Sequence, residues 1–466
     1  MRYEGLQYRD SGRSPWVAAF WTVLALTTAL RFLYAVSLPL TGDEAYFWEW
    51  ARHPALGYYD HPPMAGWILI VTRFLLGDTV AAVRIFAVLS ASLVVVIVNR
   101  FTLDITGSAT RAALAGLLAM ALPLLEVLGV IYSTDTPLLL AGTLGGYMFH
   151  RAVTRGEMRA WMLTGACFAV VIASKFLGAP LLLACILYLL ARPEARLHLA
   201  TAGPHVALLL AATGMIPVLV WNARNDWATF AFNLASRHAP PALGIRHTAD
   251  YLAGQALALS PIVMLLGVYL LAKAVPVWRR GDGPHWQLPA FLAAVPLGGF
   301  LALSLVSKVG LHWPGVGVPF LVVALGVWLT ERKVVTGNYI ACLTTSAAIT
   351  VLLFLLPLAV VLLPPDWQYP LRPDKISSDQ LRKFTVSTRD LGDSVQEVLE
   401  ELAGNGPAFV FTRSYALSSL VAFYTPSHPE VTVLGGGSAH GRNHLYWFEP
   451  SEHVGRDAVF VTYASF

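Results

Sequence analysis

The sequence is dominated by long apolar runs, and these constrain the fold more than any other feature. About eleven runs reach the length of a membrane-spanning helix; they lie near residues 16–38, 79–99, 111–131, 134–153, 161–178, 179–191, 204–221, 251–273, 287–306, 314–330 and 339–363. Only 13% of the 466 residues are charged, whereas a soluble chain carries charge at about a quarter of its positions. The sequence therefore predicts a polytopic α-helical membrane protein.

Lysine and arginine are distributed unevenly over the loops between these runs. The basic residues of one set of loops are Arg2, Arg9, Arg13, Arg100, Arg111, Arg151, Arg155, Arg159, Arg192, Arg196, Lys273, Arg279, Arg280, Arg332 and Lys333. The opposite set carries only Arg52, Lys175, Arg224, Arg237, Arg246 and Lys308. The positive-inside rule then predicts a cytoplasmic N-terminus. Eleven spans place the loops at 39–78, 222–250 and 307–313, together with the C-terminal tail, on the extracytoplasmic side.

The composition changes after Pro364-Pro365, where charges become frequent and no further span appears. We expect a transmembrane domain over residues 1–363 and a small extracytoplasmic α/β domain over residues 364–466. In the tail, the pattern predicts helices near 390–403 and 414–424 and short buried strands at 408–412, 431–434 and 458–463. The run 62–76 is too short to span comfortably, so it predicts an interfacial or re-entrant helix.

The loop after the first span contains two adjacent acids, Asp43 and Glu44, among aromatic side chains. Carboxylates at a membrane surface are costly and often functional. If Asp43 opens a helix, Phe47 and Trp50 lie on its face at i+4 and i+7. A helix cap with first-turn acids explains the same pattern structurally, and capping is compatible with catalysis.

Further polar or aromatic side chains fall in the loops assigned to this side. They are Tyr59, Asp60, His61, Asp135, Lys175, Arg237, His238, Lys308, His312 and Trp313. Each has an ordinary explanation as a turn, a cap, a snorkelling lysine or a solvated loop, but the cations among them together suit a phosphate group. The sequence contains no Walker A loop, GxGxxG unit or HExxH motif, so it does not support nucleotide-driven pumping or zincin chemistry. Cys167, Cys185 and Cys342 lie in apolar runs, which argues against a disulfide framework or a cysteine metal site.

Together, the acidic loop after the first span and the polar segments of the later loops resemble the sequence pattern of the GT-C membrane glycosyltransferases. The similarity is to the bacterial branch of the dolichyl-phosphate-mannose–protein mannosyltransferase family that includes the lipid A aminoarabinose and galacturonic acid transferases. The matching segments are Gly42-Asp43-Glu44-Ala45-Tyr46, Asp60-His61-Pro62-Pro63, Thr134-Asp135, Ser174-Lys175, Trp221-Asn222, Asp226-Trp227 and His312-Trp313-Pro314, with Ala422-Phe423-Tyr424, Gly441-Arg442-Asn443 and Gly455-Arg456-Asp457-Ala458 in the tail. His61 departs from the pattern, since the aminoarabinose transferases have lysine there.

The resemblance implies a GT-C fold in the bacterial inner membrane. It also implies a polyprenyl-phosphate-linked sugar as donor and a glycolipid or glycan of the cell envelope, such as lipid A or lipopolysaccharide, as acceptor, with transfer on the extracytoplasmic side. Besides these substrates we expect membrane lipids, and no nucleic acid, as partners.

The resemblance also suggests roles for the candidate residues. Asp43, paired with Glu44, is expected to act as the base that activates the acceptor hydroxyl in an inverting displacement. The donor phosphate is expected to be neutralised by His61, Lys175, Arg237 and His312. Substrate contacts are expected from Tyr59, Asp60, Asp135, His238, Lys308 and Trp313. The scheme needs no cofactor or metal, and a carboxylate-bound divalent ion stays open.

Three alternatives to this function stay open. A protein O-mannosyltransferase with the same architecture would need to accept an extended peptide. A transporter or flippase for the lipid-linked sugar would favour inverted repeats and charges near the bilayer midplane, whereas here the charges gather at one surface. A catalytically inactive envelope scaffold would not need Asp43.

Overall fold

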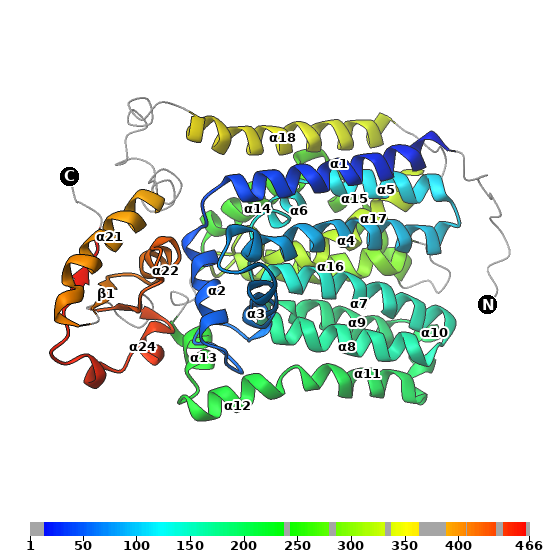
Figure 1. Cartoon of the computed structure of the whole chain (residues 1–466). Coiled ribbons are helices and arrows are strands. Elements are labelled where there is room, and N and C mark those ends of the chain that lie inside the picture. Colours follow the sequence, from blue (N-terminus) through cyan, green and yellow to red (C-terminus); the bar gives the residue numbers. More distant parts are fainter. Residues whose placement is uncertain are drawn as a thin grey trace. The chain divides into compact units, whose positions relative to one another are not determined.

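The computed structural model describes residues 14–236, 243–278, 286–330, 337–362, 388–406, 408–434 and 441–462 (Figure 1). The chain divides into two compact units, each assembled from separate stretches. The first unit comprises Met1–Leu33, Ala87–Val218 and Ala239–Leu353, and the second comprises Tyr34–Phe86, Leu219–His238 and Phe354–Phe466. The domain boundary predicted after residue 363 lies outside the described residues and stays a prediction.

The first unit is a bundle of helices. It contains α5 (Ala109–Ala121), α6 (Pro123–Leu128), α7 (Asp135–Arg155), α8 (Met158–Ser174), α9 (Ala179–Ala191), α10 (Pro193–Arg196), α11 (Ala202–Thr213), α14 (Ile245–Leu259), α15 (Pro261–Trp278), α16 (Gln287–Ser304) and α17 (Val318–Thr330), and the 3-10 turns η1 (Phe176–Gly178), η2 (Leu197–Ala200) and η4 (Trp313–Gly317). Four described helices contribute residues to both units: α1 (Pro15–Ser37), α4 (Val80–Thr106), α12 (Ile216–Arg224) and α18 (Gly337–Leu362).

Helix α17 forms the centre of the first unit, because nearly every one of its side chains is buried. It packs against α5 and α16. At the contact with α5, a Cβ on Gly326 would lie 2.7 Å from the Cβ of Ala115. The two helices can approach this closely only because glycine has no side chain.

Six described helices are long and apolar enough to cross a membrane, or up to eight if each bent helix pair forms one span. The least buried candidates, α1 and α18, bury only 17% of their most apolar window within the protein. Apolar surface of that length suits contact with lipid. The chain is an integral membrane protein, and the predicted number of eleven spans stays a prediction.

The predicted span 204–221 is interrupted by a turn at residues 214–215, which separates α11 from α12. Two further predicted spans are interrupted at a proline, which also corrects the sequence-based expectation. The run 251–273 is divided at Ser260 into α14 and α15, which are bent by 108°. The run 111–131 is broken at Leu122 between α5 and α6. Both breaks precede a proline, which lacks an N–H and disfavours helical geometry in the residue before it. The predicted division of 161–191 into two helices is confirmed, since α8 ends at Ser174 and α9 begins at Ala179.

The second unit contains the first loop and the tail. Helix α2 (Gly42–Arg52) packs against both α3 (Met64–Leu76) and α22 (Tyr415–Tyr424). The last turns of α3 expose apolar side chains, with Phe74 87% exposed. The predicted short helix is therefore confirmed, and its position at the membrane interface stays a prediction. Two short segments, α13 (Ala228–Ala231) and the π-helix η3 (Phe232–Ser236), complete this part.

The tail forms a small α/β layer within the second unit. A parallel three-stranded sheet has the order β2-β1-β3, with β1 (Phe409–Thr412), β2 (Val431–Val433) and β3 (Ala458–Phe460). Helix α22 connects β1 to β2, as parallel pairing requires a crossover. The other elements are α21 (Thr388–Leu402), η5 (Ala403–Asn405), α24 (His444–Trp447) and η6 (Pro450–His453).

The predicted helices and strands of the tail are confirmed, except that β3 is not a buried strand. Ala458 and Phe460 are exposed. Because β3 lies at one edge of the sheet and pairs only with β1, its pattern of apolar residues does not require burial on both faces.

Candidate active site

Helix α2 begins with the capping arrangement that its sequence predicts. Thr41 is the N-cap; its hydroxyl accepts a hydrogen bond from the Glu44 N–H, and the Glu44 carboxylate accepts one from the Thr41 N–H at 2.9 Å. This reciprocal pair satisfies two backbone donors that a helix N-terminus leaves open. Asp43 and Glu44 both lie in the first turn, where the helix dipole favours negative charge.

Glu44 is fully buried and paired with Arg84, which extends from the start of α4. The Arg84 Nε and Nη2 atoms donate to the two carboxylate oxygens of Glu44, each at 2.7 Å. Arg84 also donates to the carbonyl oxygens of Ala35, Leu38 and Pro39. The side chain of Glu44 therefore anchors α2 to the end of α1.

Asp43 points away from this pair and lies in a different environment. Its side chain is 62% exposed. The Tyr415 hydroxyl donates a hydrogen bond to Asp43 Oδ1 at 2.6 Å, and the Arg442 Nη1 atom lies 4.0 Å from the same oxygen. Helix α22 begins at Tyr415, and a Cβ on Gly42 would lie only 2.5 Å from the Cβ of Ala416. The glycine before Asp43 thus allows the close approach that brings the tyrosine to the acid.

Arg442 connects Asp43 to a second, buried acid. Its Nη1 atom donates to Asp60 Oδ2 at 2.8 Å, while the Tyr46 hydroxyl donates to Asp60 Oδ1 at 3.2 Å. The guanidinium stacks on the Tyr415 ring, 3.7 Å from the ring centroid. We refer to Asp43, Asp60 and Arg442 as the carboxylate cluster. It contains two carboxylates and one fixed cation, and it therefore keeps a net negative charge.

The protonation states of its partners are fixed by burial and charge. Burial and the nearby Asp43 carboxylate raise the pKa of Tyr415 well above its usual range. Burial likewise raises the pKa of Tyr46, and the negative charge of Asp60 raises this pKa further. Although burial alone would lower the pKa of Arg442, the Asp60 charge raises it overall. Both tyrosines therefore remain hydrogen-bond donors, and the arginine remains a cation.

The neighbouring predicted residues are buried beside this cluster. His61 is 7% exposed, and its Nε2 atom lies 3.9 Å from Asp60 Oδ2. The Tyr59 N–H donates to the Asn443 side-chain oxygen at 2.7 Å. The Tyr59 ring packs against Phe232, with the ring centroids 4.9 Å apart.

A second group of predicted residues meets in the first unit. The Lys175 ammonium donates to Asp135 Oδ2 at 2.7 Å. The His312 Nε2 atom lies 3.4 Å from Lys175 Nζ and 3.5 Å from Asp135 Oδ2. Asp135, Lys175 and His312 lie at the start of α7, in the break after α8 and just before η4, respectively. The side chains of Asp135 and Lys175 are buried, whereas that of His312 is 42% exposed.

Two further predicted residues that the structure describes, Lys308 and Trp313, lie outside these two groups. Lys308 is exposed, and Trp313 packs beside a small apolar cluster of Tyr251, Phe300 and Val309. Arg237 and His238 lie outside the described residues. Within the described ranges, no group of three or more histidine, cysteine, aspartate or glutamate side chains is arranged to hold a metal ion.

Comparisons with known proteins show what this chain is similar to. Residues 60–221 match the sequence model of the family described as dolichyl-phosphate-mannose-protein mannosyltransferase. The lipid A galacturonosyltransferase RgtD of Rhizobium johnstonii is 23% identical over 236 residues; the match covers 50% of this chain and 49% of that protein. The chain thus spans about half the length of this curated relative.

Solved structures resemble the chain over a greater length. ArnT from Cupriavidus metallidurans in the apo state superposes with a TM-score of 0.63 at 18% identity, covering 96% of this chain and 89% of that one. ArnT bound to undecaprenyl phosphate gives 0.62 at 17% identity with the same coverage. The chain has the GT-C fold. The oligosaccharyltransferase of Archaeoglobus fulgidus in the apo form is more distant, with a TM-score of 0.51 at 13% identity, over 90% of this chain and 64% of that one.

The resemblance noted in the sequence is thereby confirmed, but the motifs that carried it did not reveal every residue of this candidate site. Tyr415 had no sequence signal. Arg442 stood in the Gly441-Arg442-Asn443 motif without an assigned role. Arg84 appeared as a basic residue inside an apolar run. Both arginines could have been expected from electrostatics, because a buried carboxylate requires a cation nearby.

Proposed function

We propose that this protein is a membrane glycosyltransferase that transfers a sugar from a polyprenyl-phosphate donor to a lipid A-type glycolipid of the cell envelope. The observation that carries the proposal is the setting of Asp43. It is an exposed carboxylate held by Tyr415 beside Arg442, whereas Glu44 and Asp60 are buried in ion pairs. The exposed acid is the one that a substrate hydroxyl can reach.

Asp43 acts as the general base in this scheme. The acceptor hydroxyl is a weak nucleophile, and transfer of its proton to a positioned carboxylate lowers the barrier to attack on the anomeric carbon. The Tyr415 hydroxyl occupies Oδ1 and fixes the carboxylate rotamer. Because the displacement is direct, the anomeric configuration inverts. Glu44 then serves as the anchor of α2 rather than as a second base.

The Asp135, Lys175 and His312 group is the proposed donor-phosphate site. Lys175 is already oriented by Asp135, and the more exposed His312 forms the open edge at which a phosphate can bind the ammonium. Cationic groups at this position stabilise the charge that develops as the lipid phosphate leaves. ArnT has been solved with undecaprenyl phosphate bound, which supports a lipid phosphate as the leaving group. His61, Arg237, His238, Lys308 and Trp313 remain proposed contributors to substrate binding.

The similarity to RgtD supports lipid A as the acceptor. The match of residues 60–221 to the mannosyltransferase family model favours a protein hydroxyl instead, and this is the second candidate. We also propose that the protein resides in the bacterial inner membrane, with its N-terminus in the cytoplasm and its tail domain outside, because the basic loop residues gather on one side.

The test is sugar transfer by the purified protein in nanodiscs, with radiolabelled polyprenyl-phosphate sugars as donors. Lipid A and a serine- and threonine-rich peptide serve as separate acceptors. We expect wild type to label lipid A, and Asp43→Asn to lose about 10²- to 10⁴-fold in kcat, the usual contribution of a general base. We expect Lys175→Gln to raise the KM for the donor.

Asp393→Asn is the matched control, because Asp393 is an exposed aspartate on α21 outside both groups. It is expected to retain full activity. Equal product from wild type and Asp43→Asn would remove Asp43 from the chemistry. Labelled peptide without labelled lipid A would favour the protein mannosyltransferase, and labelled lipid that crosses the bilayer without any product would favour a flippase.

A further inference from the structure

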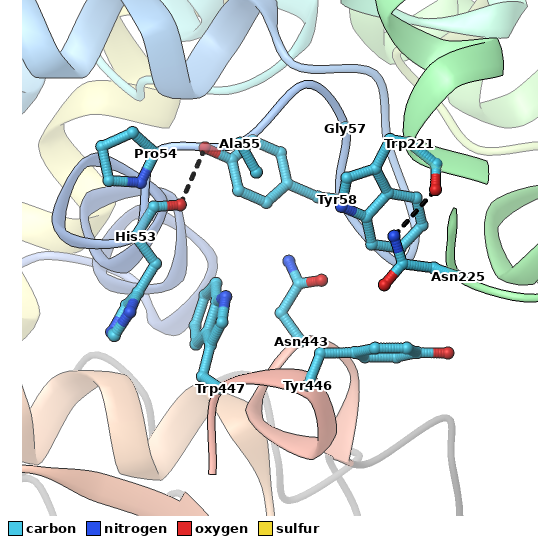
Figure 2. Close-up of a pocket in the computed structure, with 10 residues that line it drawn as sticks. All are labelled: His53, Pro54, Ala55, Gly57, Tyr58, Trp221, Asn225, Asn443, Tyr446 and Trp447. Atoms are coloured by element: carbon cyan, nitrogen blue, oxygen red, sulfur yellow. Dashed lines mark hydrogen bonds between the residues drawn. The ribbon is translucent and has the colours of Figure 1, made fainter. Parts of the chain in front are cut away.

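The second unit contains a cavity of about 330 Å³ that has no role in the proposed reaction. Ten residues line it: His53, Pro54, Ala55, Gly57, Tyr58, Trp221, Asn225, Asn443, Tyr446 and Trp447 (Figure 2). Its volume lies near the lower end of the range of small-molecule sites, about 300–1,000 Å³. It is therefore large enough for a sugar ring but not for a lipid chain.

The walls of the cavity combine flat aromatic rings with amide groups. Rings are contributed by Tyr58, Trp221, Tyr446 and Trp447, and the Trp447 ring is stacked on His53 with centroids 4.5 Å apart. Figure 2 shows Asn443 projecting between Trp447 and Tyr446 toward Tyr58, with Asn225 on the side of Trp221. None of the ten lining residues has a carboxylate, ammonium or guanidinium group. The cavity thus suits a neutral ligand with apolar faces and polar edges.

One amide in this cavity is buried without a hydrogen-bond partner. Asn443 is 1% exposed, and its side-chain oxygen accepts from the Tyr59 N–H. Its amide nitrogen is buried and has no partner among the described residues. An unpaired buried donor costs about 1–3 kcal/mol, and a ligand oxygen that accepted a hydrogen bond from this amide would offset that cost.

We propose that this cavity is a subsite for an uncharged pyranose ring of the acceptor glycan. A pyranose presents C–H faces to aromatic rings and hydroxyl edges to amides, which matches these walls. The assignment to the acceptor rests on the proposed function. It follows from chain connectivity, because Asn443 reaches the cavity while the preceding residue, Arg442, binds Asp60 and approaches Asp43. The Asn443 N–H also donates to the Tyr46 hydroxyl, which in turn donates to Asp60.

The first test measures binding without catalysis. Full-length protein in nanodiscs is dialysed against a radiolabelled, unphosphorylated disaccharide of N-acetylglucosamine, whose acetylated amines carry no charge. Tyr446→Ala removes an exposed ring from the cavity wall, and Asn443→Asp removes the amide donors while keeping the oxygen that binds the Tyr59 N–H. We expect each change to weaken binding about tenfold, the scale of one lost aromatic or hydrogen-bond contact.

Tyr269→Ala is the matched control. Tyr269 is 48% exposed and Tyr446 is 44% exposed, but Tyr269 lies on α15 in the first unit and contacts Lys273. We expect it to bind the disaccharide as wild type does. Wild-type affinity in both cavity variants, or equal weakening in the Tyr269 variant, would overturn the proposal.

The second test distinguishes the acceptor from the donor as the source of the ring. In the transfer assay, Tyr446→Ala should raise the KM for lipid A about tenfold and leave the KM for the polyprenyl-phosphate sugar unchanged. The reverse pattern would contradict the assignment to the acceptor. A third outcome is that neither wild type nor any variant transfers sugar, while the cavity variants still bind the disaccharide more weakly than wild type does. That result would contradict the proposed function and would still support the saccharide site.

Discussion

Glu44→Gln separates the structural role of this residue from the catalytic role that its place beside Asp43 first suggested. Glutamine keeps the size of the side chain and one oxygen for the Thr41 N–H, but it removes the charge that faces Arg84. The two side chains are 0% and 2% exposed, so the arginine would be left as a buried cation without its carboxylate. Removing one partner of a buried ion pair costs about 3–5 kcal/mol. Because glutamine retains one acceptor, we expect a loss near 3 kcal/mol.

Arg84→Met is the complementary change. It leaves Glu44 as an unpaired buried carboxylate and removes the donors to the Ala35, Leu38 and Pro39 carbonyl oxygens. We expect it to cost at least as much as Glu44→Gln. The double variant should lose about 1–3 kcal/mol less than the sum of the single variants, because the two changes remove the same interaction.

The assay is thermal unfolding of the detergent-purified variants, paired with transfer activity per folded protein at low temperature. We expect Glu44→Gln to melt at a lower temperature and to keep the activity of wild type once the folded fraction is taken into account. Asp43→Asn should show the opposite pattern, with normal melting and little activity. A Glu44→Gln protein with unchanged melting and lost activity would refute the structural role.

Two further predictions concern packing and pH. Gly42→Ala should destabilise the protein by about 1–3 kcal/mol through overpacking against Ala416, and the added change Ala416→Gly should recover part of the melting temperature; no recovery would contradict the close contact. Burial lowers the pKa of His444 to about 4, below the value of about 6.5 in an unfolded chain. Stability should therefore fall as the pH drops from 6.5 to 4, by up to about 3 kcal/mol. In urea titrations over this pH range, His444→Gln should reduce this loss, whereas His205→Gln at an exposed site should not.

Most of the helices and strands could be predicted from the sequence because they depend on local patterns. Apolar runs and their breaks indicated α8 and α9, and short apolar segments separated by turn residues indicated β1 and β2. The failures also have local causes. The run 251–273 contains Ser260-Pro261, and a search for apolar length alone treats this pair as part of one continuous helix. The break between the two helices can be predicted only if the backbone restriction of the residue before proline is considered together with hydropathy.

The candidate site could be predicted only in part. The sequence indicated Asp43, Asp60, Asp135 and Lys175, since each is polar in a setting where polar groups are costly. It gave no pairing between Asp60 and Arg442, which are 382 positions apart. Such a pairing depends on how α22 and the sheet pack against α2, and side-chain packing over that separation leaves no periodic signal in one sequence.

The charge pattern of the described residues explains which of these acids is available for chemistry. Five carboxylates are buried, those of Glu44, Glu49, Asp60, Glu126 and Asp135. Each has a basic partner: Arg84, Arg52, Arg442, Arg31 and Lys175, respectively. Burial without a cation would cost several kcal/mol, so each pair follows from the fold alone. Asp43 differs, because it is exposed and has its nearest guanidinium nitrogen at 4.0 Å. Its position is not required by charge burial, and this supports the proposal that Asp43 is the base.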